Sequence, residues 1–273
     1  SKDENNSIFT NNQSLLSERK FKRLEQDFYS YRDLAAIYTS PILPEHITPL
    51  VIAESDNDLY NLPPEYFNKG HLEHQITYFM GDINFHWKDS QNSNYVKKMD
   101  HLDRNYITPY VPHTFISRSE GSYIIAVTYK SMYSESKQDE YFKLVDQNIS
   151  LNNFSDHNKK EIKFCSRSQN SLSECFFDKP RNPITCVYSD SFKTKSNKLD
   201  RHSWLYVVSG SMRLNVTNEQ TLVLSKGDSI VLENSAEIIK LSNDMCVIEV
   251  SLLAPKIISN LDLETEIIQV GSS

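Results

Sequence analysis

The stretch GHLEHQITYFMGDINFHW, residues 70–87, contains two short runs rich in β-branched and aromatic residues, QITYFM and INFHW. Gly81 separates them, as a turn separates two neighbouring strands. Runs of the same kind follow at 105–117 (NYITPYVPHTFIS) and 122–131 (SYIIAVTYKS). Upstream, PILPEHITPLVIAE alternates prolines with β-branched residues and is typical of extended chain. The sequence therefore predicts a block of consecutive β-strands here.

A second block of short strands begins near residue 183. Its runs are ITCVYSDSF, WLYVVSGSMRLNV, TLVLSKGDSIVLEN and AEIIKLSNDMCVIEVSLL, broken by Gly and Asn/Asp turns. A hairpin with a glycine turn that leads into KGDSIVLEN has the shape of half a cupin jelly roll. We therefore expect a mainly β fold with two cupin-like (jelly-roll) barrels in one chain.

The segments around these blocks are more polar. Residues 17–38, SERKFKRLEQDFYSYRDLAAIY, place apolar residues at helical spacing and predict an N-terminal helix. Residues 132–165 have little β character and predict a short, partly helical connector. The expected organisation is a polar tail (1–16), a first cupin domain (17–131), a connector (132–165), a second cupin domain (166–262) and a tail (263–273).

Composition limits the classes of partner. The net charge of −7 argues against nucleic acid as the main partner, whereas a few local cations still allow an anionic small molecule to bind. No apolar run reaches the length of a membrane span, and the polar N-terminus does not resemble a signal peptide. The four cysteines form no CxxC motif, so we expect reduced thiols in a cytoplasmic protein.

The histidines of the first block are candidate metal ligands. On a straight strand His71 and Gln75 would lie roughly 13 Å apart, too far to share a metal. Joint ligation therefore needs a bend, which Gly70 could supply, and His113 would come from a neighbouring strand. Two histidines and one oxygen ligand, with open positions left over, suit an Fe(II) oxygenase.

Other interpretations of these side chains stay open. A histidine in a β protein is more often a packed or surface residue than a ligand. On spacing alone, metal binding and a structural role are therefore about equally well supported. His74 has the opposite strand parity to His71 and is not expected to be a ligand, and His86 could be a wall residue. Glu73 has the chemistry of a ligand but could equally form a surface ion pair.

The second block lacks a comparable set. HSWLYVVSG contains one histidine, His202, and carries Tyr206 where a cupin would place a carboxylate; ENSAEIIKL contains no histidine. We therefore expect the second domain to bind no metal and His202 to be a structural or surface residue.

Two motifs in the first block resemble a known family. NKGHLEHQITYFMGDINFHW followed by YITPYVPHTF is similar to the first cupin of the family of hydroxyethylphosphonate dioxygenases and methylphosphonate synthases. RLEQDFYSYRDLA is similar to that family's segment of an arginine followed by Phe-Tyr-x-Tyr. The resemblance covers about 21–130 and extends weakly to 183–250, where the family has a degenerate second cupin.

The resemblance implies roles for particular residues. His71 and His113 would be Fe(II) ligands, which makes 17–131 the iron-binding domain. Arg23, Tyr31 and Asn68 would bind a phosphonate, and a guanidinium fork with neutral donors suits that dianion.

The third ligand separates the two enzymes of the family. The dioxygenases carry a glutamate six residues before the second histidine, where this chain has Ile107, or Thr108 in a gapped alignment. The synthases resemble this chain, with isoleucine at that place and a glutamine four residues after the first histidine. Gln75 would then replace the missing carboxylate, and Ile107 would set the product.

The resemblance thus implies an oxidoreductase of phosphonate biosynthesis. It would cleave the carbon–carbon bond of 2-hydroxyethylphosphonate with O2 to give methylphosphonate and CO2 or bicarbonate. The alternatives are a hydroxyethylphosphonate dioxygenase, which gives hydroxymethylphosphonate and formate, and a non-catalytic cupin that binds phosphonates. No residue matches the family's active-site lysine, which a partner subunit supplies, so assembly as a homo-oligomer stays open.

Overall fold

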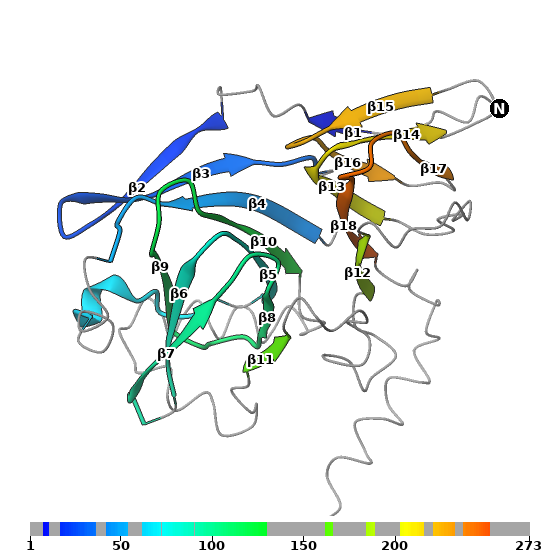
Figure 1. The fold of residues 1–273 in the computed structure, drawn as a ribbon. Coiled ribbons are helices and arrows are strands. Elements are labelled where there is room, and N and C mark those ends of the chain that lie inside the picture. Colours follow the sequence, from blue (N-terminus) through cyan, green and yellow to red (C-terminus); the bar gives the residue numbers. More distant parts are fainter. Residues whose placement is uncertain are drawn as a thin grey trace, which may run out of the picture. The chain divides into compact units, whose positions relative to one another are not determined.

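The computed structural model describes residues 8–10, 17–36, 42–53, 62–71, 73–89, 91–129, 162–165, 184–188, 203–215, 221–232 and 237–251. The chain divides into two compact units, 10–176 and 177–273 with 1–9, and each is described by itself. Nearly all described secondary structure is β, which confirms the predicted mainly β class (Figure 1). No helix among these residues is long and apolar enough to cross a membrane.

The first unit contains two antiparallel sheets. The larger one has seven strands in the order β11 (Ile162–Cys165), β8 (Arg104–Ile107), β5 (His74–Met80), β10 (Tyr123–Tyr129), β4 (Ile42–Pro49), β3 (Gln26–Asp33) and β2 (Arg19–Arg23). The smaller one has three strands in the order β7 (Asn94–Met99), β6 (Ile83–Lys88) and β9 (His113–Ser117).

A core of aromatic and aliphatic side chains joins these two sheets. Phe28, Phe79 and Ile124 come from the seven-stranded sheet, and Phe85 and Phe115 come from the three-stranded sheet. Each of them is buried, and together they form one cluster, so the sheets pack face to face as in a jelly roll. Within the described residues the sheets do not close into a barrel.

The predicted N-terminal helix is wrong. Residues 19–33 form the hairpin β2–β3 instead, with Leu24 and Glu25 at positive φ in its turn. Tyr29 and Tyr31, two residues apart, face the same side of the hairpin. The ring centroids of Phe21 on β2 and Tyr31 are 6.4 Å apart. Because β3 also pairs along β4, tertiary pairing outweighs a pattern that matches helical spacing.

The other strand predictions for this unit are confirmed, with one omission. The runs quoted above correspond to β4, β5, β6, β8, β9 and β10. The missed strand is β7, whose sequence NYVKKM is largely exposed and too polar to stand out. The predicted connector lies mostly outside the described residues, and its last part forms β11, which pairs with β8.

The second unit repeats the two-sheet arrangement. Five strands lie in the order β1 (Ile8–Thr10), β16 (Ser229–Leu232), β13 (Ser203–Ser209), β18 (Cys246–Ser251) and β12 (Ile184–Tyr188). Three more lie in the order β15 (Thr221–Ser225), β14 (Ser211–Asn215) and β17 (Glu237–Lys240). Leu205, Val207, Met212, Leu224 and Ile230 are buried in its core. His202 lies outside the described residues.

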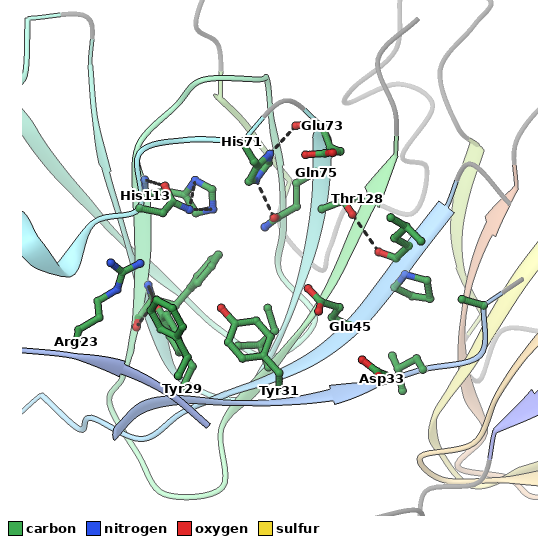
Figure 2. Close-up of a pocket in the computed structure, with 18 residues that line it drawn as sticks. Arg23, Tyr29, Tyr31, Asp33, Glu45, His71, Glu73, Gln75, His113 and Thr128 are labelled. Atoms are coloured by element: carbon green, nitrogen blue, oxygen red, sulfur yellow. Dashed lines mark hydrogen bonds between the residues drawn. The ribbon is translucent and has the colours of Figure 1, made fainter. Parts of the chain in front are cut away.

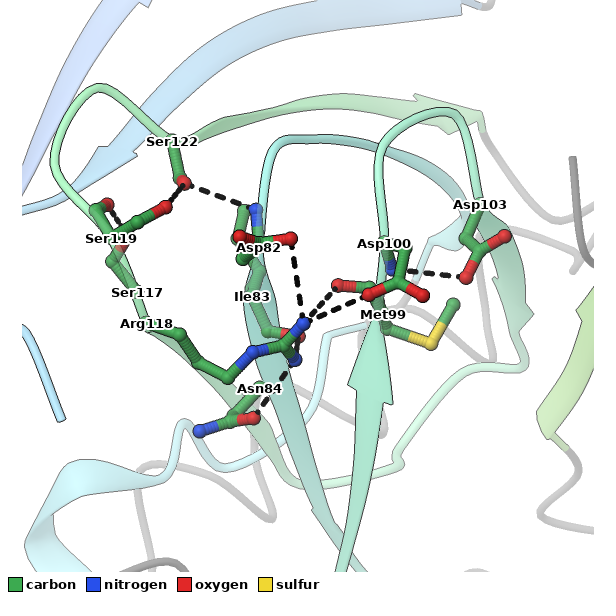
Figure 3. A network of polar contacts seen from close by, with 10 residues as sticks. All are labelled: Asp82, Ile83, Asn84, Met99, Asp100, Asp103, Ser117, Arg118, Ser119 and Ser122. Atoms are coloured by element: carbon green, nitrogen blue, oxygen red, sulfur yellow. Dashed lines mark hydrogen bonds and ion pairs between the residues drawn. The ribbon is translucent and has the colours of Figure 1, made fainter. Parts of the chain in front are cut away.

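Arg118 ties together the end of the first unit's small sheet (Figure 3). Its Nη1 donates to the Ile83 carbonyl (3.0 Å) and to Asn84 Oδ1 (3.2 Å). Its Nη2 donates to the Met99 carbonyl (3.3 Å) and to Asp100 Oδ1 (2.9 Å). One planar guanidinium thus holds β6, β7 and the residue after β9 in register.

We expect Arg118→Ala to lower the free energy of unfolding of the first unit by about 2 kcal/mol, because it removes the four hydrogen bonds of a largely buried guanidinium. The chain has two tryptophans, so in a Trp204→Phe background Trp87 fluorescence reports this unit during urea unfolding. Lys22→Ala, an exposed change on β2, is the control and should shift the midpoint little. An equal effect of the two changes would contradict the role of Arg118.

Candidate metal centre

A cavity of about 580 Å³ opens between the strands of the first unit. His71, Gln75 and His113 approach it from one side, and Tyr31 with Arg23 approach it from the other (Figure 2). The structure therefore brings together every residue that the sequence proposed as a ligand, and Asn68 also lines the cavity.

The bend that ligation requires is present before β5. Gly70 has φ +81°, and the Tyr110 N–H donates to the His71 carbonyl (2.9 Å). The chain turns there, so His71 lies beside Gln75 and not one full strand length away from it. His71 Nε2 is 3.1 Å from Gln75 Oε1, and the rings of His71 and His113 are 5.2 Å apart.

Both histidines are oriented by backbone carbonyls. The Nδ1 of His71 lies 2.6 Å from the Glu73 carbonyl, and the Nδ1 of His113 lies 2.8 Å from the Val111 carbonyl. A carbonyl only accepts, so each Nδ1 carries the proton and each Nε2 keeps its lone pair. Burial lowers the pKa of His71, and burial lowers the pKa of His113 to about 3, so both rings are neutral near pH 7.

Gln75 completes the set through its amide oxygen. Its Nε2 donates to Thr77 Oγ1 (2.8 Å), which turns Oε1 toward His71 Nε2. Two lone pairs then face each other at 3.1 Å with no proton between them. Two ligand atoms, each about 2.1 Å from one ion and at right angles to each other, would lie about 3 Å apart. The donor set therefore fits a metal cation.

Asn68 connects the loop before β5 to the second histidine. Its Oδ1 accepts from the Gly70 N–H (3.0 Å) and from the His113 N–H (2.9 Å). This fixes the amide so that Nδ2 lies 3.1 Å from His113 Nε2. If a cation took that nitrogen lone pair, the Asn68 N–H would be free to donate to a bound anion.

The cavity wall opposite the histidines offers hydrogen-bond donors. Arg23 donates from Nη1 to the carbonyls of Glu65 (3.1 Å) and Phe67 (3.2 Å), which places the guanidinium at the cavity edge. Burial raises the pKa of Tyr31, so its phenol stays protonated and can donate. A cation and a neutral donor thus face the lone pairs of the histidines. Asp33 and Glu45 also line the cavity, and both carboxylates are paired with Arg19 (Figure 2).

Sequence reasoning missed Tyr29. Its hydroxyl meets Thr114 Oγ1 (2.7 Å) and accepts from the Phe115 N–H (2.8 Å), so it anchors β9 next to His113. Burial raises the pKa of Tyr29 to about 12. The Tyr-x-Tyr spacing could have identified it, because residues two apart on a strand lie on one face, as Tyr29 and Tyr31 do. The predicted helix at 17–38 did not place them on one face.

Ile107 lies directly opposite Gln75 where β8 pairs with β5. Directly opposed side chains share a face of the sheet, with Cβ atoms about 5 Å apart. Ile107 is fully buried in the core cluster, so it presents an apolar surface beside the amide of Gln75. Thr108, the gapped alternative, comes after the end of β8.

The remaining candidates occupy other places. His74 stacks on the rings of Tyr106 (5.8 Å) and Tyr129 (5.2 Å), and its Nδ1 meets the Tyr106 hydroxyl at 2.7 Å. His86 is buried on β6 opposite Thr114. In the described part of the chain, no three His, Cys, Asp or Glu residues lie close enough together to hold a metal. Glu73 lines the cavity without completing a carboxylate site.

Two neutral histidine nitrogens and one amide oxygen that line one cavity resemble the two-histidine, one-carboxylate set of a mononuclear metal centre with open positions, with an amide in place of the carboxylate. Two-histidine sites completed by an oxygen ligand are the class used by non-haem iron oxygenases.

The chain is similar to known proteins in sequence and in fold. The chain is 40% identical over 136 residues to a methylphosphonate synthase from Nitrosopumilus maritimus, which covers 49% of this chain and 29% of that protein. The aligned part is thus less than a third of that relative's length. No protein-family model matches the chain. The family resemblance indicated by the motifs is confirmed.

The fold is similar to that of known structures. A Streptomyces albus HEPD with 2-hydroxyethylphosphonate and Fe(II) bound has a TM-score of 0.70 at 16% identity, covering 97% of this chain and 80% of that one. PhpD with cadmium atoms has a TM-score of 0.62 at 14% identity, covering 93% and 80%.

Gly70→Ala should weaken metal binding, because a Cβ at that place would come within 2.6 Å of the Tyr110 carbonyl carbon and displace the loop that positions His71. Gly121→Ala is the matched control: it also has positive φ (+76°), but its Cβ would meet open space. Both changes impose backbone strain of about 1 kcal/mol. Anaerobic Fe(II) titration should find reduced affinity only for Gly70→Ala, and equal affinities would refute this role of the loop.

Proposed function

We propose that this protein is a mononuclear non-haem Fe(II) oxygenase that converts 2-hydroxyethylphosphonate and O2 to methylphosphonate and CO2 or bicarbonate. The observation that carries the proposal is the unprotonated contact between His71 Nε2 and Gln75 Oε1. Among the described residues, no group of three His, Cys, Asp or Glu could hold a metal in its place. The 40% identity to a methylphosphonate synthase supports it.

His71, Gln75 and His113 would hold the iron. When bound, Fe(II) supplies a site that binds O2 and accepts electrons from the substrate. Because Gln75 is neutral, this centre carries one more positive charge than a site with a carboxylate ligand. That charge favours a phosphonate dianion and makes metal retention depend in part on substrate.

The other cavity residues would bind and orient the phosphonate. Arg23 would contribute positive charge, while Asn68 Nδ2 and the protonated phenol of Tyr31 would donate hydrogen bonds. With the phosphonate held by these three groups, the hydroxyl end of the substrate would face the histidines. Apolar walls beside them, including Ile107, would exclude water from the reacting carbon atoms.

The proposed reaction needs no external reductant. The atoms of 2-hydroxyethylphosphonate plus O2 equal those of methylphosphonate plus carbonic acid. They also equal those of hydroxymethylphosphonate plus formic acid, so the substrate supplies all four electrons in either case. The choice between the two products therefore depends on the surroundings of the intermediate and not on a co-substrate.

Phosphorus NMR of a reaction with 2-hydroxyethylphosphonate tests this function directly. Anaerobically Fe(II)-loaded protein should produce methylphosphonate after air is added. Gln75→Ala and His113→Ala should each abolish turnover, because each removes a ligand. His101→Ala, on an exposed loop, should retain activity. Full activity in either ligand variant would refute the assignment.

Ile107→Glu should shift the product toward hydroxymethylphosphonate and formate. The new carboxylate would sit opposite Gln75, within reach of the metal, and would alter both the charge and the ligand set. Ile107→Gln, which has similar length and no charge, is the control. The product ratio read by phosphorus NMR checks this, and an unchanged ratio would mean that position 107 does not set the product.

A phosphonate-binding protein is the second candidate, because an amide is a weaker ligand than a carboxylate and the metal site could be vestigial. A binding protein need not hold Fe(II), and Gln75→Ala would leave its affinity for 2-hydroxyethylphosphonate unchanged. Calorimetric titration of phosphonate with and without Fe(II) distinguishes the two functions.

We further infer that the two units correspond to two cupin-like domains near 17–131 and 166–262, joined through 132–165. The similar pairing of a larger and a smaller sheet in each unit supports this. The second domain would have a structural role through packing. It would bind no metal, because its sequence lacks the cluster of histidines that a metal-binding cupin carries. The four cysteines form no CxxC motif, and we infer a cytoplasmic setting from this.

A further inference from the structure

A row of three side chains crosses the small sheet of the first unit. His113 on β9 lies directly opposite Trp87 on β6, and Trp87 lies directly opposite Tyr95 on β7. Residues that are directly opposed across neighbouring strands share one face of the sheet. The row therefore begins at a proposed metal ligand and ends at a ring that is 45% exposed.

The two outer rings of this row are in contact, and Phe85 lies between Trp87 and His113. The Trp87 ring stacks on the Tyr95 ring with centroids 5.5 Å apart and an interplanar angle of 17°. Phe85 fills the space toward the metal centre, with its ring 5.4 Å from Trp87 and 6.0 Å from His113. Trp and Tyr are the side chains whose rings lose an electron most readily, whereas Phe only fills the gap.

The outer end of the row has a proton acceptor. The Tyr95 hydroxyl donates to Asp89 Oδ2 (3.1 Å), and Asp89 Oδ1 accepts from the N–H groups of Gln91 (2.8 Å) and Ser93 (2.9 Å). The turn thus holds the carboxylate in place beside the phenol. A tyrosine loses an electron far more easily when a base takes its proton.

Other rows on the described strands beside the metal centre do not combine a Trp, an exposed Tyr and a base. Tyr106 meets the base His74, but its ring is buried. The neighbouring row of the same sheet runs Phe115, Phe85, Lys97 and has no Trp or Tyr. Gln75 on the large sheet is flanked by Ile107 and Thr128. Tyr29, although close, is buried and bonded to Thr114 and to the backbone of Phe115, neither of which is a base.

We propose that Trp87 and Tyr95 form an electron-transfer path that protects the metal centre when O2 reacts without substrate. The proposal rests on the proposed iron-dependent function. Trp87 gives one electron to the oxidised centre, Tyr95 gives one electron to Trp87, and the phenol proton passes to Asp89. The net change is one-electron reduction of the centre and a neutral tyrosyl radical at the surface, which a thiol reduces with one electron and one proton.

The test exposes Fe(II)-loaded protein to air without substrate or thiol. Bound iron is first measured by chelation assay. Electron paramagnetic resonance of frozen samples should then detect a tyrosyl radical, and peptide mass spectrometry should locate oxidation at Tyr95 and Trp87. Tyr95→Phe should lose the radical, and Trp87→Phe should lose Tyr95 oxidation and gain oxidation at His71 and His113.

Two further variants sharpen the result. Trp204→Phe makes the same substitution at the chain's other tryptophan, buried in the second unit, and should leave the radical unchanged. Asp89→Asn keeps the acceptor for the turn but removes the base, so the radical yield should fall while iron binding stays at the wild-type level.

The outcomes separate the two proposals. If iron does not bind, the proposed function fails and the electron path fails with it. If iron binds but oxidation is confined to Tyr31 or to the histidines in the wild type, the path is overturned and the function stands. Unchanged Tyr95 oxidation in Trp87→Phe with normal iron content also overturns the path.

Discussion

The site depends on the fact that a neutral histidine has only one N–H to donate. The Glu73 carbonyl takes the proton of His71 on one side, so the other nitrogen can only present a lone pair to Gln75. In the structure the Gln75 N–H donates to Thr77 Oγ1, so the amide presents its oxygen to the ring. Burial opposes protonation of the ring, whereas a cation bound between the two lone pairs would stabilise both of them.

Much of this arrangement could be predicted from the sequence. The β-branched and aromatic runs gave correct strands, and Gly70 gave the bend that lets His71 approach Gln75. The hairpin at 19–33 could not be predicted, because its charged and apolar residues fit helical spacing equally well and only pairing with β4 decides between the two. Because this segment was predicted as a helix, Tyr29 was not identified as a residue of the site. The register that places Ile107 opposite Gln75 follows from strand pairing and cannot be predicted from the sequence alone.

The two sides of the cavity play different physical parts. One side is a set of acceptors fixed by the backbone. The other carries the positive charge of Arg23 and the phenol of Tyr31, while the carboxylates of Asp33 and Glu45 on that side are paired with Arg19. An anion with a neutral polar end suits this asymmetry, because each end finds the complementary wall. Such a cavity orients its ligand before any reaction begins, which shifts the entropic cost of alignment to the binding step.

Strand β2 carries Arg23 and is the outermost of the described strands in its sheet. Unpaired backbone groups on an outer strand invite pairing with other chains, and closely spaced cations oppose it. The sequence of β2, RKFKR, places four positive charges in five residues, most of them exposed. The strand that would bring a cation to the phosphonate therefore also resists aggregation, so replacing its charges to alter specificity would carry a risk for solubility.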